Sequence, residues 1–259
     1  MEHIKTYRVN QNFSQILYLS RRWVSEHPGP RRTWLITVCL IGQGIFSLGH
    51  LLPPNLIPLL ILPLLAVFAY LDGGILGFAE FSRREHPVSA RTLPVFAAFY
   101  FRRSFVVTFL GSLGTAGFVI PAAFCWEWTW KLLPCAGLLT AALLFLLGVP
   151  YANPLSVVDN SPAFVAILKS FRLARENQGT SLGILILFLL LPLAGFGAFH
   201  YLGHMLPFPA NLLLSLSGNV LAAYILLHGR VACFFVAYAK RRRRRSGRSG
   251  SSYPLKKSF

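Results

Sequence analysis

The ionisable side chains within long apolar stretches are the first candidates for chemistry. Asp72 stands in the sequence YLDGGILG, toward the end of one apolar stretch, and Arg230 stands toward the end of the last one. A charge in hydrocarbon is unfavourable, so it normally faces other helices and finds a partner. We therefore expect Asp72 and Arg230 to approach each other as an intramembrane polar pair. The alternative is that each side chain extends separately to the membrane surface.

Three histidines could supply ligands for a metal. His200 and His204 are one helical turn apart near the end of the fifth apolar stretch, and His50 ends the first. Three imidazoles can bind a transition metal. No carboxylate is paired with them locally, however, so we expect interfacial histidines without a metal. Whether the three side chains converge depends on the tertiary structure.

Other features do not indicate an enzyme. The chain has only 8 Asp and Glu residues, few for hydrolase or phosphotransferase chemistry, and no H-E-x-x-H or Walker-type sequence. The 4 cysteines occur singly, which predicts neither a zinc site nor a disulfide framework. Asn153, Asp159 and Asn160 have the residue types of a turn and a helix cap. We therefore expect no catalytic residue and no cofactor.

Long apolar stretches supply the elements that must position these residues. Hydrophobic residues make up 54% of the 259-residue chain and charged residues only 13%, about half the charged content of a soluble domain. A helix needs about 20 mostly apolar residues to cross the hydrocarbon. Six stretches qualify, near 34–52, 55–79, 104–124, 131–151, 181–201 and 210–230. We predict an all-α integral membrane protein, with six transmembrane helices over 34–239 after a cytoplasmic segment over 1–33.

Two local features bear on how the predicted helices pack and sit. Gly73 and Gly77 have the four-residue spacing that permits close approach of two membrane helices. Trp34 opens the first predicted span, and an indole ring is favoured at the level of the lipid headgroups. We therefore expect the glycines to serve packing and Trp34 to be an interfacial anchor.

The basic residues predict the orientation of the chain. Net charge is +17, and all of the 25 Lys and Arg residues except Lys131 fall on one side of the predicted spans. Positive residues remain cytoplasmic because their translocation is disfavoured. We therefore expect a multi-pass protein of the cell inner membrane with both termini in the cytoplasm.

A polybasic segment over 240–259 follows the last predicted span. Its five consecutive arginines would meet the anionic inner leaflet, at about 1 kcal/mol per residue; they are Arg241, Arg242, Arg243, Arg244 and Arg245. Binding of nucleic acid is not expected, because no aromatic residue is interleaved with the arginines. A membrane or cytoplasmic protein partner remains an alternative. The composition of 240–259 predicts disorder.

An amphipathic helix is predicted in NSPAFVAILKSFRLARENQG, with Ser161 as N-cap and Pro162 at the first helical position. Its apolar residues follow the i, i+3, i+4, i+7 pattern of one helix face, namely Phe164, Ile167, Leu168 and Phe171. Such a helix lies in the membrane interface. Its basic residues, Lys169, Arg172 and Arg175, are expected to contact anionic lipid.

Two further segments resemble this helix and indicate a threefold repeat. NQNFSQILYLSRRWVSEH precedes the first span, with Phe13, Ile16, Leu17 and Val24 opposite its arginines, and HPVSARTLPVFAAFYFRRS precedes the third as a poorer copy interrupted by Pro94. At an offset of about 75 residues, leucines such as Leu35, Leu110 and Leu185 coincide. The possible unit is an amphipathic helix plus a two-span hairpin, with successive copies in the same orientation.

Two stretches carry a resemblance to a known group. GGILGFAEFSRREHPVSARTLPVFAAF is similar to a Gly-rich span end and basic turn, and VVDNSPAFVAILKSFRLARENQGTSLGILIL is similar to a pattern in which Ala166, Ser170, Leu173 and Asn177 hold the matching positions. Over residues of about 60–200 the chain resembles a broad group of bacterial six-span proteins, related to the membrane domain of glycerophosphodiester phosphodiesterases. Because no soluble phosphodiesterase domain is present, the resemblance implies the architecture and not that activity.

These features favour a non-enzymatic function. We expect a structural or accessory membrane protein whose basic face contacts anionic lipid. The alternative is a small-solute transporter or channel, with a path lined by Asp72, Arg230 and the glycines of the second and third spans. Transporters usually show more intramembrane polar groups, which favours the first function.

Overall fold

The computed structural model describes residues 12–51, 57–83, 89–126, 132–207 and 210–249, and every regular element in these ranges is a helix. Among the described residues, five helices are long and apolar enough to cross a membrane: Leu60–Ser82, Ala90–Ala122, Pro134–Val158, Gln178–Gly203 and Ala210–Lys240. These helices confirm the prediction of an all-α protein with several helices long and apolar enough to span a membrane.

The helices are joined in the order α1 (Phe13–Glu26), α2 (Pro28–Leu51), α3 (Ile57–Ser82), η2 (Ala90–Thr92), α4 (Leu93–Trp126), α5 (Leu132–Gly148), η3 (Val149–Tyr151), α6 (Ala152–Val158), α7 (Ala163–Glu176), α8 (Gln178–Leu185), the π-helical turn η4 (Ile186–Leu190), α9 (Leu191–His204) and α10 (Ala210–Ser249). Helices α1 and α7 confirm the short helices predicted at these two places.

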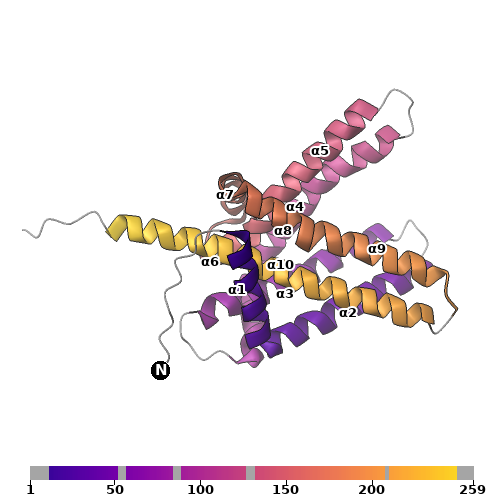
Figure 1. The fold of residues 1–259 in the computed structure, drawn as a ribbon, viewed down its shortest axis with the longest axis horizontal. Coiled ribbons are helices and arrows are strands. Elements are labelled where there is room, and N and C mark those ends of the chain that lie inside the picture. Colours follow the sequence, from indigo (N-terminus) through magenta and orange to yellow (C-terminus); the bar gives the residue numbers. More distant parts are fainter. Residues whose placement is uncertain (1–11, 52–56, 84–88, 127–131, 208–209, 250–259) are drawn as a thin grey trace, which may run out of the picture.

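The long helices form hairpins that meet at one end of the molecule (Figure 1). Hairpins α2–α3, α4–α5 and α9–α10 converge where α1, α6 and α7 lie, and the α4–α5 hairpin diverges from the other two toward its tip. We call the converging end the base; it comprises α1, α7 and the stretches 71–80, 151–158 and 231–239. Helix α10 extends past the base.

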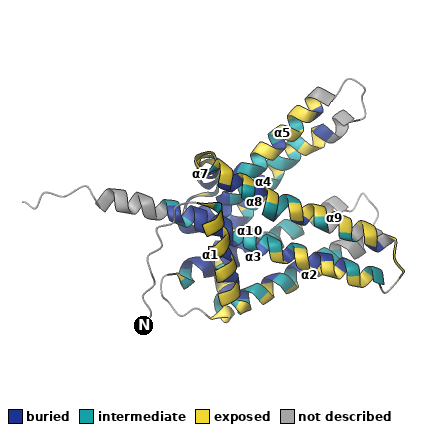
Figure 2. Cartoon of the chain, in the orientation of Figure 1, coloured by how far each residue is buried: buried dark blue, intermediate teal, exposed yellow. Residues whose placement is uncertain are grey.

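Burial follows this arrangement. Every residue of 71–80 and of 151–158 is buried, and so is nearly all of 231–239. Figure 2 shows buried residues gathered at the base, while the described parts of the hairpins beyond it are largely intermediate or exposed. Large apolar side chains dominate those outer parts, including Leu144 at 61% and Leu193 at 65% exposure. Exposed apolar surface of this extent is typical of helices that meet lipid.

The third predicted amphipathic segment is not a separate helix. Residues Leu93–Trp126 form one helix of 34 residues, and Pro94 is its second residue rather than an interruption. The first turn of a helix has no internal partners for its N–H groups, so a proline there breaks no hydrogen bond. The threefold repeat of amphipathic helix plus hairpin therefore lacks this element as a separate helix.

The start of α2 also differs from its prediction. Trp34 is only 2% exposed, and its indole Nε1 donates a hydrogen bond to the carbonyl oxygen of Ala223 at 2.9 Å. The prediction of an interfacial anchor was therefore wrong for Trp34. The sequence marks an indole near a span end, but here α10 supplies both the apolar contact and the hydrogen-bond acceptor.

The predicted disorder of 240–259 was wrong for its first half. Helix α10 continues through the five arginines to Ser249, and residues 250–259 lie outside the described part of the chain. Arginine is a good helix former, and extending an existing helix avoids the cost of nucleation. At 1.5 Å per residue the 40-residue helix is about 60 Å long, roughly twice the thickness of the hydrocarbon.

Candidate functional site

The predicted approach of Asp72 and Arg230 is present at the base. Asp72 on α3 is 2% exposed, and its Oδ1 lies 3.3 Å from Nε of Arg230 on α10. This contact lacks the geometry of a directed hydrogen bond, so it is a Coulombic ion pair. The Arg230 side chain is 35% exposed. The acid is therefore fully enclosed, whereas its cation reaches the surface.

Asn153 completes this polar cluster. Its Nδ2 donates hydrogen bonds to Asp72 Oδ2 and to Thr108 Oγ1 of α4, both at 3.1 Å. Asn153 stands on α6 and is 4% exposed. The cluster of Asp72, Thr108, Asn153 and Arg230 thus joins α3, α4, α6 and α10.

The prediction that Asn153 belongs to a turn was wrong, whereas it holds for its two companions. Asp159 is the C-cap residue of α6, and Asn160 adopts a left-handed conformation with φ of 53°. The four-helix cluster draws Asn153 inward instead. A signal was available in the sequence, because an amide within a long apolar run is costly unless it finds a partner.

The glycines beside Asp72 are packing residues. A Cβ atom at Gly77 would lie 2.8 Å from Tyr100 Cδ2, and one at Gly73 would lie 3.2 Å from Tyr100 Cβ. Helix α4 therefore covers the glycine face of α3, which confirms the predicted close approach. Glycine is required at Gly77 because a larger residue would displace the ring of Tyr100, which is itself buried.

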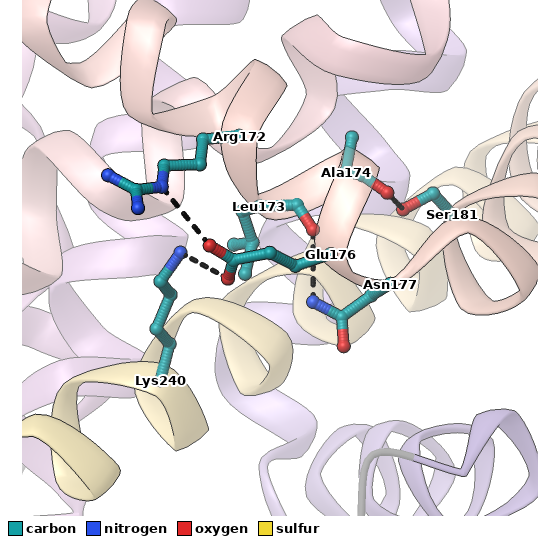
Figure 3. A network of polar contacts seen from close by, with 7 residues as sticks. All are labelled: Arg172, Leu173, Ala174, Glu176, Asn177, Ser181 and Lys240. Atoms are coloured by element: carbon teal, nitrogen blue, oxygen red, sulfur yellow. Dashed lines mark hydrogen bonds and ion pairs between the residues drawn. The ribbon is translucent and has the colours of Figure 1, made fainter.

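A second ionic cluster joins α7 to α10 at the surface (Figure 3). One carboxylate oxygen of Glu176 lies 2.6 Å from Lys240 Nζ, and the other lies 3.3 Å from Arg172 Nε. The hydrogen bond from Lys240, with further attraction from both cations, holds the pKa of Glu176 below its ordinary value. The Glu176 side chain is 45% exposed, so water and salt screen these contacts.

The basic residues of α7 fall into two groups. Lys169 is directed to the start of its own helix, where its Nζ donates to Ser161 Oγ at 2.7 Å and lies 3.4 Å from Asp159 Oδ2. Arg172 and Arg175 point outward, with the Arg172 side chain 75% exposed. The expected lipid contact therefore fits Arg172 and Arg175 better than Lys169.

The start of α7 was predicted incorrectly in one detail. The helix begins at Ala163 with Pro162 as N-cap residue, and no side chain caps it. Ser161 instead accepts the hydrogen bond from Lys169. The hydrogen bond between Lys169 and Ser161 joins a residue inside the helix to one before its start. Capping preferences do not predict this bond, because they concern only the residues at the helix end.

A G-x-S-x-G pattern, typical of serine hydrolases, occurs in GTSLG over 179–183. Its Ser181 lies inside α8, is 3% exposed, and exchanges a hydrogen bond of 2.9 Å with the Tyr151 hydroxyl. Ser181 Oγ also lies 3.4 Å from the carbonyl oxygen of Ala174 (Figure 3). A nucleophile elbow requires an exposed serine at a strand-to-helix turn. The pattern therefore serves helix packing here.

Two groups of predicted residues have side chains outside the described part of the structure. They are the arginines 241–245, whose backbone is helical, and the histidines His50, His200 and His204. Among the described residues, no group of three His, Cys, Asp or Glu could hold a metal ion.

Comparison with protein-family models, with curated proteins and with solved structures gave no match. The resemblance to the six-span bacterial group therefore remains a prediction.

Proposed function

We propose that this chain is a non-enzymatic protein of the cell inner membrane, with a structural or accessory role and a basic cytoplasmic face that contacts anionic lipid. In this proposal α2 is a sixth span. Its apolar part, residues 34–51, extends about 27 Å, close to the thickness of the hydrocarbon. An even number of spans returns both termini to one side, as the distribution of basic residues requires.

The observation that carries the proposal is the continuity of α10. Its apolar part, Ala210–Lys240, leads without a break into residues 241–245 as one helix. The five arginines therefore follow directly on a segment long enough to cross the membrane. Contact with anionic headgroups contributes about 1 kcal/mol per basic residue near the surface. Nucleic acid is not proposed as a partner, whereas a protein partner at the same face is compatible with this role.

The polar cluster at the base supports a structural role over the alternative of a transporter or channel. Asp72 is enclosed and is engaged by Arg230 and Asn153. The glycines of α3, Gly73, Gly74 and Gly77, are covered by side chains of α4 such as Tyr100. Intramembrane charges that serve transport usually face a water-filled cavity. Here Asp72 and Asn153 join helices to one another.

Binding of anionic lipid can be tested by replacing all five residues of 241–245 with Gln. We expect the purified full-length variant to retain about one tenth of the phosphatidylglycerol that the wild type retains, or less, because most of the charge beside the last span is lost. Native mass spectrometry measures the retained lipid. Two controls match this variant: Lys at all five positions, which keeps the charge, and Lys256→Gln with Lys257→Gln. Unchanged retention would refute the proposed lipid contact of the five arginines.

The orientation requires a separate test. A single cysteine introduced at Ser89 should be inaccessible to a membrane-impermeant maleimide added outside intact cells, and should react after the cells are opened. The described native cysteines, Cys39, Cys135 and Cys233, are buried, and Cys125 is replaced by Ser in this variant so that labelling reports on position 89. Labelling from outside would overturn the proposed topology. Solute uptake that Asp72→Asn abolishes would instead favour the transporter.

A further inference from the structure

The exposed face of α7 changes character along the helix. Phe164 and Leu168 are 66% and 56% exposed, whereas Arg172 and Arg175 occupy the same face further along. At 3.6 residues per turn, positions 164, 168, 172 and 175 lie along one side of a helix. The first half of this face is therefore apolar and the second half is cationic. An interfacial helix with a uniform apolar side would not show this division.

The opposite face of α7 fixes the helix against α5. Ala166, Ser170 and Leu173 are buried, and Ser170 Oγ donates a hydrogen bond to the carbonyl oxygen of Gly148. The Phe171 ring, which lies on the same side of α7 as Phe164, also turns to α5 and occupies the space that a side chain at Gly148 would need. Gly148 belongs to the apolar segment Pro134–Val158. Helix α7 therefore lies beside a segment long enough to span the membrane.

Charge on the exposed face is concentrated at the two arginines. Lys169 is engaged with Ser161 and Asp159, and the Glu176 carboxylate is held by Lys240. Arg172 contacts Glu176 only through Nε in the described structure. A guanidinium carries five N–H donors in a planar fork, so donors of Arg172 remain for another acceptor. Planar pairs of N–H groups match the oxygens of a phosphate.

We propose that α7 binds one anionic phospholipid of the inner leaflet. Arg172 and Arg175 hold the headgroup phosphate, and the exposed side chains of Leu168 and Phe164 contact the apolar part of the lipid. The apolar half of the face selects a lipid over free phosphate, and the cationic half selects an anionic lipid. This inference rests on the proposed function and identifies a defined site for it.

Native mass spectrometry of the full-length protein tests the site with phosphatidylglycerol as the probe. Arg172→Gln with Arg175→Gln should reduce retention about tenfold, because two headgroup contacts are lost. The charge-matched control, Arg31→Gln with Arg32→Gln, removes two cations at the start of α2, outside the proposed site, and should reduce retention by a clearly smaller factor than the 172/175 variant. The Lys versions at 172 and 175 should retain part of the binding.

The apolar half of the site has its own test. Phe164→Ser with Leu168→Ser should weaken retention of phosphatidylglycerol although every charge is kept, and 10 mM inorganic phosphate should not displace the lipid. Displacement by phosphate would overturn the proposal, because the site would then be one for anions alone.

Two outcomes separate this inference from the broader proposal. Equal loss in the 172/175 and 31/32 variants would show that total charge, and not a site on α7, determines binding. Unchanged retention in the 172/175 variant, as expected if the surface serves a protein partner, would also overturn the inference. In either case a loss caused by replacing 241–245 would leave the proposed function standing.

Discussion

Helix α10 forms ion pairs with two carboxylates of other helices. The two pairs differ in burial, and the order of their distances does not reflect this difference. Lys240 lies 2.6 Å from Glu176, whereas Arg230 lies 3.3 Å from Asp72. Glu176 is 45% exposed and Asp72 only 2%. The closer pair is screened by water, and the longer pair is enclosed with an asparagine as second partner. Burial, more than separation, therefore decides how much each pair matters to stability.

The comparison also distinguishes what the two pairs join. Asp72 lies in a cluster that holds α3, α4, α6 and α10 together at the base. Glu176 connects only the end of α7 to α10. Removing one partner of a buried pair leaves an uncompensated charge, whereas an exposed charge can be hydrated. We therefore expect variants of the two pairs to differ several-fold in their effect on the free energy of unfolding.

The largest effect is expected for Arg230→Ala. Asp72 would remain enclosed with Asn153 as its hydrogen-bond partner, which should lower the free energy of unfolding by about 3–5 kcal/mol. Asp72→Ala should cost less, because Arg230 is 35% exposed and can turn to water or headgroups. Denaturant titration in detergent measures both. The reverse order would contradict the difference in burial within this pair.

A charge exchange tests whether the two groups act as a pair. The double variant Asp72→Arg, Arg230→Asp should be more stable than either single variant, since both charges regain a partner. A double variant no more stable than the single ones would show that the pair does not contribute as described.

An intermediate effect is expected for Gly77→Ala, which tests the packing beside Asp72. The new methyl group would meet Tyr100 Cδ2 at 2.8 Å and Phe96 Cβ at 2.9 Å. Overpacking of this kind costs about 1–3 kcal/mol. The matched control is Gly137→Ala on α5, where a Cβ meets nothing within 4 Å; it should be neutral or slightly stabilising. Equal stability of the two variants would contradict close packing of α3 on α4.

The smallest effect is expected for Glu176→Gln. Exposed pairs contribute about 0.2–1 kcal/mol, so the variant should lose no more than this at neutral pH. Because the pKa of Glu176 is lowered in the folded protein, its contribution is complete above the ordinary value of 4.5 and is lost as the pH falls through the lower folded value. Wild type and variant should therefore become equally stable in acid.

A control for that measurement is Glu26→Gln. Glu26 pairs with Arg22 at 2.6 Å within one helix and has a similar exposure of 52%. The variant Glu26→Gln should lower the free energy of unfolding by about 0.3–0.5 kcal/mol. Added salt should reduce the effects of both variants. A loss at Glu176 as large as that of Arg230→Ala would remove the distinction between the two pairs.

Much of the local structure could be predicted from the sequence. Apolar length indicated the long helices, and apolar periodicity indicated α1 and α7. The cost of an isolated charge in hydrocarbon predicted that Asp72 and Arg230 would meet, although they are far apart in the chain. The six-span count, the orientation and the lipid contacts stay predictions, since they concern a membrane that surrounds the protein.

Other features depend on contacts between distant segments and were missed for that reason. Trp34 is buried because α10 covers it, and Asn153 turns inward because Asp72 and Thr108 accept its hydrogen bonds. Lys169 is drawn to Ser161 and Asp159 across the start of α7. Residue type alone assigns each of these three to a surface or a turn.

The sequence by itself determined that this chain is apolar, helical and charged mainly at the ends of its apolar stretches, because these properties follow from composition and periodicity. Only the tertiary structure decided which face of each helix is covered, which cation each carboxylate meets, and which arginines of α7 remain outward. The reason is physical: a helix forms from local backbone bonds, but the environment of a side chain is made by segments that the sequence does not place beside it.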